Sequence, residues 1–115
     1  MKEPRRESVT VQSLRFVGEQ DGVPERELKR RLCDLFDEQQ IIGRAYLARA
    51  IYDTADETNV VLCLTVVRGE FESLNAAIGH VFHGMFRSTE HLDVILLTED
   101  QEAQLAPVVE PFYSA

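Results

Sequence analysis

The sequence predicts one α+β domain with a ferredoxin-like β-α-β-β-α-β order, in which a four-stranded antiparallel sheet carries two helices on one face. Two observations predict this class. Strand-like and helix-like hydrophobic periods alternate along the chain, and a short polar loop separates two apolar extended runs near its middle. The length of 115 residues suits a single core. A short C-terminal helix and a tail complete the predicted architecture.

The first two elements are a strand and a helix. Residues 8–17, SVTVQSLRFV, are rich in β-branched and aromatic side chains, which favours a strand. Pro24 suits the first turn of the helix that follows the loop GEQDG. Residues 1–7 are polar, so we expect a flexible lead there and the domain over residues 8–115. The apolar side chains of this helix recur at helical spacing: Leu28, Leu32, Leu35 and Phe36.

The second half of the chain repeats this alternation. Thr98 followed by Gln101 fits a capping box at the start of a short helix. The predicted elements are a strand over 44–52, a strand over 60–67, a helix over 70–86, a strand over 91–97 and a helix over 98–106.

Composition limits the classes of partner. The formal net charge is -8, which argues against nucleic acid and against an anionic membrane surface. The only basic cluster, Arg26 with residues 29–31, lies on the first predicted helix and is best interpreted as a solvated face. The N-terminus lacks an apolar secretory core, and the two cysteines form no disulfide framework. We therefore expect a cytoplasmic protein.

The predicted sheet is apolar on both sides, although helices on one face would leave the other to solvent. Three covers are open: the C-terminal tail, a second copy of the chain, or another protein. We expect Phe112 and Tyr113 to be buried, within the monomer or at an interface. From the second face we take Tyr46, Ala48 and Cys63 as interaction candidates.

The helix over 70–86 carries two histidines on its outer face. His80 and His83 are three residues apart and could share a metal, but a useful site needs a third ligand, and Glu90 and His91 lie beyond the helix end. We therefore predict no metal site. The same face has small residues, so Ala76 and His80 are candidates for a contact surface, with ordinary helix variation as the equal alternative.

No pattern indicates catalysis or a cofactor. The sequence has no Gly-rich phosphate loop and no nucleophile elbow around a serine. The loop EQDGVPE, with Asp21 and Gly22, occupies the place where regulatory domains of the ACT type bind amino acids, by analogy of fold. The sequence thus predicts a protein that is not an enzyme, with amino-acid binding as the alternative function.

Four segments of the sequence resemble a known family. They are RAYLARAIYD at 44–53, VVLCLTVV at 60–67, LDVILLTED at 92–100 and VVEPFY at 108–113. Together they resemble the C-terminal domain of the SseB, or enhanced serine sensitivity, protein family over about residues 9–113. The resemblance implies an α+β module without a defined enzymatic activity. Family members carry another domain ahead of this one, and we expect none in this chain.

The leading prediction is therefore a non-catalytic protein-interaction or self-association module. We expect its partner to be another copy of the chain, as in a homodimer, or a separate protein.

Overall fold

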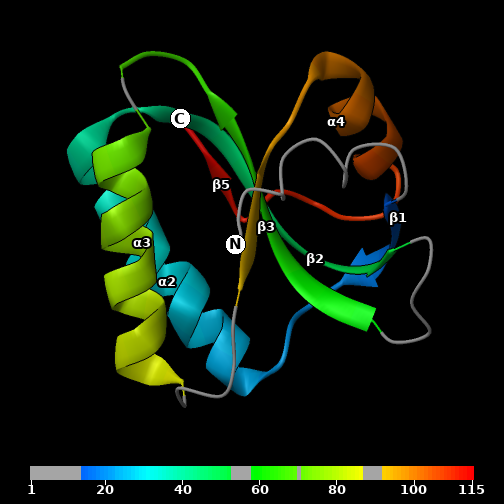
Figure 1. Cartoon of the computed structure of the whole chain (residues 1–115), viewed down its shortest axis with the longest axis horizontal. Coiled ribbons are helices and arrows are strands. Elements are labelled where there is room, and N and C mark those ends of the chain that lie inside the picture. The colour runs from blue at the N-terminus through cyan, green and yellow to red at the C-terminus, as the bar shows by residue number, and fades with distance from the viewer. Residues whose placement is uncertain (1–13, 53–57, 70, 87–91) are drawn as a thin grey trace.

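The computed structural model describes residues 14–52, 58–69, 71–86 and 92–115 (Figure 1). The predicted alternation of strands and helices is confirmed, with boundaries shifted by a few residues. The residues predicted to form the flexible lead and the start of the first strand lie outside the described ranges. The described elements are β1 (Leu14–Glu19), α2 (Val23–Gln39), β2 (Ile42–Tyr52), β3 (Thr58–Val66), α3 (Glu72–Met85), β4 (Asp93–Leu96), α4 (Glu99–Leu105) and β5 (Tyr113–Ser114).

The sheet is mixed, and the predicted ferredoxin-like antiparallel sheet is wrong. The described strands lie in the order β1-β2-β3-β4, and β5 pairs with β2. β2 is antiparallel to β1, β3 and β5, whereas β4 runs parallel to β3. The α+β class is confirmed. The pairing differs because α3 carries the chain back to the start of β3, which makes its next strand a parallel neighbour.

β5 and β1 both pair with the same edge of β2. β1 pairs with residues 48–52 of β2, and β5 pairs with residues 44 and 45 of the same strand. The backbone N–H of Phe112 also donates to the carbonyl of Ala45 at 2.8 Å. The two short segments therefore lie on the same side of β2, one after the other, and the C-terminal tail becomes part of the sheet.

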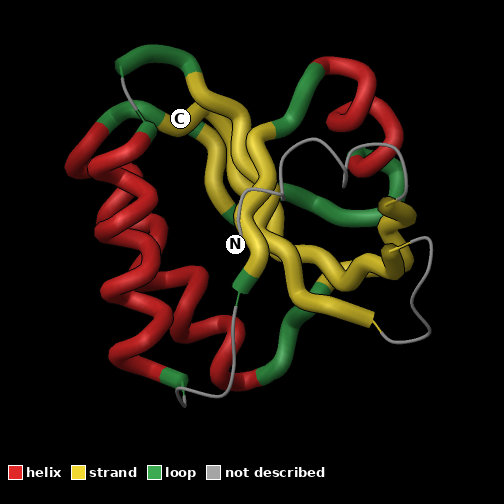
Figure 2. The backbone as a smooth tube through the Cα atoms, viewed as in Figure 1, coloured by secondary structure: helices red, strands yellow, loops and turns green. Residues whose placement is uncertain are grey.

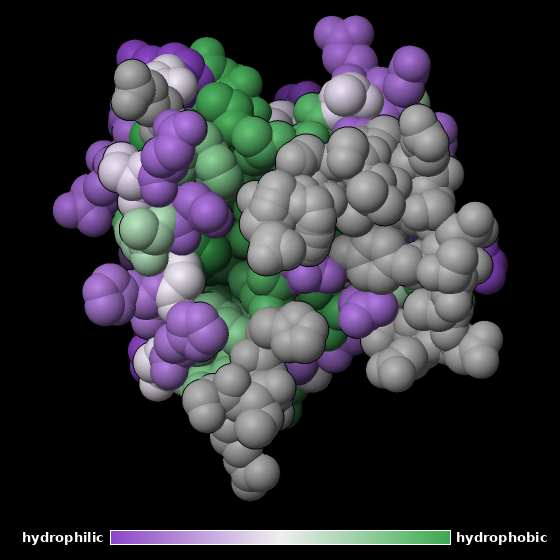
Figure 3. All heavy atoms as spheres, in the orientation of Figure 1, coloured by the Kyte–Doolittle hydropathy of each residue, from purple (hydrophilic) through white to green (hydrophobic). Residues whose placement is uncertain are grey.

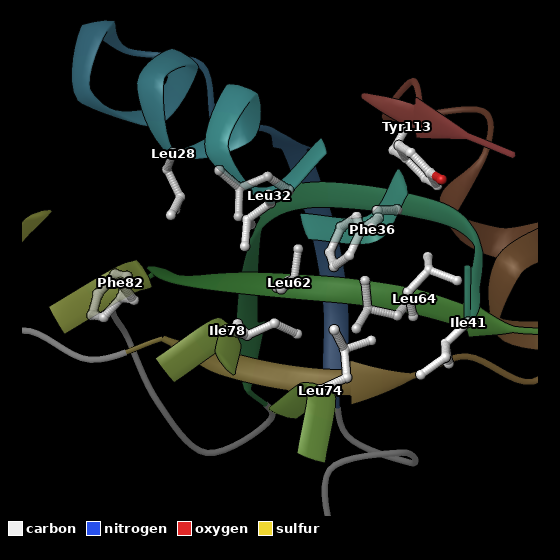
Figure 4. Packing of buried hydrophobic residues seen from close by; sticks show 13 residues of the cluster. Leu28, Leu32, Phe36, Ile41, Leu62, Leu64, Leu74, Ile78, Phe82 and Tyr113 are labelled. Atoms are coloured by element: carbon white, nitrogen blue, oxygen red, sulfur yellow. The ribbon is translucent and has the colours of Figure 1, made fainter. Parts of the chain in front are cut away.

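Two long helices cover one face of the sheet, as predicted. α2 and α3 lie together on that face, and α4 lies on the opposite side (Figures 1 and 2). The main core fills the space between the long helices and the sheet, with Phe36 at its centre beside Tyr113 (Figure 4). Its other fully enclosed side chains include Leu28, Leu32, Ile42, Leu47, Leu62, Leu64, Leu74 and Ile78. None of the described helices is long and apolar enough to cross a membrane.

A bulge at the start of β2 requires glycine. The register with β3 shifts between Ile42 and Arg44. A Cβ atom on Gly43 would lie 2.7 Å from Val67 Cγ1 and 2.9 Å from Thr65 Oγ1, which is too close for any other residue without movement. The Thr65 hydroxyl accepts a hydrogen bond from the Arg44 backbone N–H at 2.8 Å. The bulge thus fixes how the rest of β2 presents its side chains.

Candidate interaction surface

The second face of the sheet is covered by the chain itself. Tyr46, Ala48 and Cys63 form a second buried cluster beneath α4, with Leu105 and Val109 packed over them. Of the three covers left open by the sequence, the C-terminal segment therefore supplies this one. The three candidate side chains are enclosed in the folded chain and do not form an exposed docking surface.

A charged contact joins α4 to β2. The Arg44 guanidinium donates to both carboxylate oxygens of Glu102, at 2.5 and 2.9 Å, and the Tyr46 hydroxyl donates to Glu102 Oε2 at 2.5 Å. These bonds hold the pKa of Glu102 at about 2. An open pocket of about 420 Å³ lies beside them, lined by Arg44, Tyr46, Glu99, Glu102, Ala103 and Ala106. The Arg44 guanidinium and the Glu102 carboxylate that line this pocket are bonded to each other.

Phe112 and Tyr113 of the tail pack on the α2 side of the sheet and not over its second face. Tyr113 is buried, as predicted, and Phe112 is half-buried. Both pack against Phe36 of α2, with ring centroids 5.3 Å away for Tyr113 and 6.4 Å away for Phe112. The Tyr113 hydroxyl donates to Asp37 at 3.1 Å. These aromatic side chains therefore close the main core, while Val109 belongs to the second cluster.

The candidate ligand loop is occupied by internal ion pairs. Asp21 Oδ1 accepts from Lys29 Nζ at 2.9 Å, and its other oxygen accepts from Arg26 at 3.4 Å. Lys29 also donates to Glu19 at 2.7 Å, although its side chain is buried on α2. Gly22 is the N-cap residue of α2. The carboxylate that would hold an amino group is thus already paired with two cations of α2, and Lys29 also links α2 to Glu19 of β1.

The outer face of α3 is exposed, as the helical spacing predicts. Ala76, His80, His83 and Gly84 are all exposed, and a Cβ atom on Gly84 would meet nothing within 4 Å. The His83 ring packs edge-on against Phe82. Within the described ranges, no three His, Cys, Asp or Glu side chains gather so that they could hold a metal ion. The further ligands considered from the sequence, Glu90 and His91, lie outside those ranges.

Both cysteines are free and lie in environments that suppress thiolate formation. Burial raises the pKa of the Cys63 thiol to about 12. Partial burial, together with the neighbouring Asp37 carboxylate, raises the pKa of Cys33. Because the thiolate is the reactive form, neither site favours nucleophilic chemistry near neutral pH.

The β4 side of the sheet presents an apolar surface that sequence reasoning missed. β4 is the last of the described strands in the sheet order. Leu96 is 47% exposed, and Val66 and Val67 at the end of β3 are 38% and 63% exposed. Leu96 pairs with Leu64, two residues before Val66, so Leu96 and Val66 lie on the same side of the sheet, whereas Val67, one residue later, lies on the other side. We call Val66, Val67, Val94 and Leu96 the β4 edge surface.

Apolar atoms are also visible on one face of the molecule. In Figure 3, green apolar atoms gather beside α3 toward the middle of the view and continue to the top, near the connection from β3 to α3. The signal in the sequence was the run DVILL, which is short and has only one charged residue. Such a run is consistent with an edge strand.

The opposite edge of the sheet is built differently. β1 carries a register shift between Phe16 and Gly18, and it has charged side chains at Arg15 and Glu19. Bulges and charges on an edge strand discourage pairing with another chain. β4 has neither a register shift in its pairing with β3 nor a charge beyond Asp93 at its first position. The two edges thus differ in their readiness to accept a further strand.

Comparison with known families identifies the domain. The family model described as the SseB protein C-terminal domain matches residues 21–114. The chain belongs to this family. The match confirms the resemblance drawn from the segments in β2, β3, β4 and the tail. No curated protein and no solved structure matches the chain. In this SseB C-terminal domain, the matched range includes the three helices α2, α3 and α4 and the strands β2 to β5.

The buried Lys29 of this SseB C-terminal domain gives a first testable prediction. Its stem packs in the interior, and its Nζ lies 5.9 Å from the centre of the Phe112 ring. Lys29→Met keeps the stem and removes the charge. Because water can solvate the exposed Glu19 and Asp21 carboxylates, we expect the free energy of unfolding to change by less than about 1 kcal/mol. Lys29→Ala removes the stem as well and should cost about 2 kcal/mol. Urea denaturation measures both; equal losses would show that the ion pairs dominate.

The Glu102 contact predicts a specific acid sensitivity. Pairing with Arg44 lowers the pKa of Glu102 from 4.5 to about 2, so its stabilisation is complete above about pH 4.5 and is lost as the pH falls toward 2. We expect the stability difference between wild type and Glu102→Gln to shrink over that interval. Urea denaturation at several pH values measures it, and the subtraction removes the effect of other carboxylates. A difference that stays constant with pH would contradict the assignment.

Proposed function

We propose that this SseB C-terminal domain is a non-catalytic protein-interaction module that docks through the β4 edge surface. The observation that carries the proposal is the exposure of Leu96 on β4, the last of the described strands in the sheet order, whose one charged residue is Asp93 at its first position; Val66 and Val67 at the end of β3 are exposed as well. Exposed apolar groups at a sheet edge favour addition of another strand, because backbone hydrogen bonds and side-chain burial are gained together. The free cysteines suit a reducing, cytoplasmic setting.

The ionisable groups support a role without catalysis. A general base near neutral pH needs a pKa close to 7, whereas Arg44 holds that of Glu102 at about 2. Burial raises the pKa of the Tyr46 hydroxyl and, to about 12, that of the Cys63 thiol. These groups serve packing and ion pairing, which is the pattern of a structural scaffold.

The alternative of an amino-acid binding domain receives less support. An ACT-like site at the loop before α2 would use Asp21, but Lys29 and Arg26 already bond both of its carboxylate oxygens. A ligand amine would have to displace an ammonium group whose side chain is buried. The docking proposal requires no such displacement.

The test compares two surfaces with matched substitutions. Leu96→Lys and Ala76→Lys each add one positive charge at an exposed position, the first on β4 and the second on α3. Peptides selected from a random display library on the wild-type chain are then measured by fluorescence anisotropy. We expect Leu96→Lys to raise the Kd at least about tenfold, while Ala76→Lys leaves it within about twofold.

Two results would contradict the proposal. Loss of binding in Ala76→Lys alone would assign the interaction to the outer face of α3, where Ala76 and His80 were candidates. Failure to select any peptide whose binding depends on Leu96 would contradict docking at the β4 edge surface.

A further inference from the structure

We infer that the partner of the β4 edge surface is a second copy of this chain, whose β4 pairs antiparallel about a two-fold axis at Ile95. This inference rests on the proposed function and names its partner. The pairing would join the two sheets into one continuous sheet through two terminal strands. A two-fold arrangement lets each copy contribute the same residues to the interface.

The backbone of β4 fits this arrangement. The N–H of Leu97 donates to the carbonyl of Leu64 at 2.8 Å, on the β3 side. Backbone groups of successive strand residues point to opposite sides, so those of Val94 and Leu96 point away from β3. An axis at Ile95 sets Val94 of each copy opposite Leu96 of the other. Both residues then exchange hydrogen bonds in reciprocal pairs, as an antiparallel ladder requires.

The side chains are complementary in the same register. Val94 belongs to the periphery of the main core, so Leu96, two residues later, lies on the same side of the sheet. Each exposed Leu96 would cover the half-buried Val94 of the other copy. Ile95 packs against the second cluster and would meet its own counterpart across the axis. The contact is apolar on both sides of the joined sheet.

Charge selects this register over its neighbours. Each copy carries a formal net charge of -8, so association requires a contact that keeps carboxylates apart. An axis at Leu96 would set Asp93 opposite Glu99 of the other copy. An axis at Val94 would bring the two Asp93 residues within about two residues' rise, roughly 7 Å along the strand. With the axis at Ile95 this separation doubles to roughly 13 Å, and Asp93 lies opposite Leu97.

The first experiment measures association directly. Sedimentation velocity and native mass spectrometry of the wild-type chain should show a concentration-dependent dimer. Leu96→Lys should raise the dimer Kd at least about tenfold, and Ala76→Lys should leave it within about twofold. Added salt should strengthen the dimer, because screening reduces repulsion between two acidic copies. A wild-type chain that stays monomeric at its solubility limit would overturn the inference.

The second experiment tests the register. Residues opposite each other in a hydrogen-bonded antiparallel pair have Cα atoms about 5.5 Å apart, within disulfide range, whereas 94 and 94 or 96 and 96 would be too distant. Val94→Cys and Leu96→Cys should therefore cross-link under mild oxidation only when mixed. Wild type is the control for Cys33 and Cys63. Cross-linking of either variant with itself, or none in the mixture, would overturn this register.

Failure of the inference and failure of the proposed function give different results. A monomeric wild type that still binds peptides through Leu96 would rule out a second copy as the partner and would still support docking at the β4 edge surface. A monomeric wild type that binds no such peptide would contradict both the inferred dimer and the proposed docking function. Since Val94→Cys changes a half-buried position, the Leu96→Lys measurement keeps the inference testable if that cysteine variant is unstable.

Discussion

Phe36→Ala should lower the free energy of unfolding by about 3–5 kcal/mol, the largest loss we expect from a single substitution in this domain. Phe36 is completely buried at the centre of the main core (Figure 4). Its ring contacts both Phe112 and Tyr113, so truncation would leave a cavity and would also loosen the tail. A small domain has a total stability of only about 5–15 kcal/mol, and the variant should be close to unfolding. Urea denaturation measures the loss.

The effect on the tail separates this prediction from a general loss of packing. The backbone N–H of Ala115 donates to the carbonyl of Gly43, and its hydrogen exchange should accelerate in Phe36→Ala even where the domain stays folded. Phe86→Ala is the matched control, because Phe86 is half-buried and stacks on Phe82 at the far end of α3. We expect it to cost less than half as much. Equal costs for the two variants would mean that Phe36 is not the centre of the core.

Leu105→Ala should release α4 from the sheet. Leu105 is fully buried and packs with Tyr46, Ala48 and Cys63. It is the only buried residue of the seven-residue helix α4. We expect a loss of about 2–4 kcal/mol, since a short helix has little stability without its tertiary contact. The second apolar face should then bind a hydrophobic dye such as ANS. Thermal unfolding and dye fluorescence measure the two effects.

The control for this prediction is Leu96→Ala. Leu96 is about half exposed, so the same truncation there should change monomer stability by less than about 1 kcal/mol and should not increase dye binding. An unchanged melting temperature in Leu105→Ala, without dye binding, would contradict the assignment of α4 as the cover of the second face.

Local elements were predictable because they depend on short-range patterns. The stripe of Leu28, Leu32 and Phe36 requires a helix, and the capping box at Thr98 and Gln101 forms as predicted. The run VVLCLTVV is apolar on both sides, and β3 is indeed an interior strand covered on both faces. The family could also be identified from soft motifs, because their order and spacing along the chain are specific.

Strand order was not predictable from those patterns. The sequence RAYLARAIY is apolar on both sides, which fits an interior strand, whereas a ferredoxin-like order would place it at an edge. The charges at Arg15 and Glu19 likewise favour an edge position for β1. These signals existed, but the ferredoxin-like prediction rests on the β-α-β-β-α-β order of the elements, which does not by itself specify which strands are neighbours.

For the candidate residues, too, local spacing predicted exposure but not the contacts between distant segments. Exposure of Ala76 and His80 follows from helical spacing alone. Burial of Tyr46 and Cys63 was expected, but the element that buries them depended on where α4 folds. Asp21 is a candidate ligand group only by analogy with the ACT-type loop, and its ion pair with Lys29 joins residues that the sequence assigns to different elements. No local pattern reports such a contact.

The secondary structure, the two apolar faces of the sheet and the family are predictable from the sequence, since each is encoded in residue spacing along a few turns or strands. Contacts between distant segments determine which strands are neighbours, that α4 covers one face while Phe112 and Tyr113 close the other, and that Leu96 lies on the last of the described strands. The physical reason is that apolar patterns specify that a face must be buried and leave open what buries it. Chain connectivity and the geometry of α3 and α4 then select the cover.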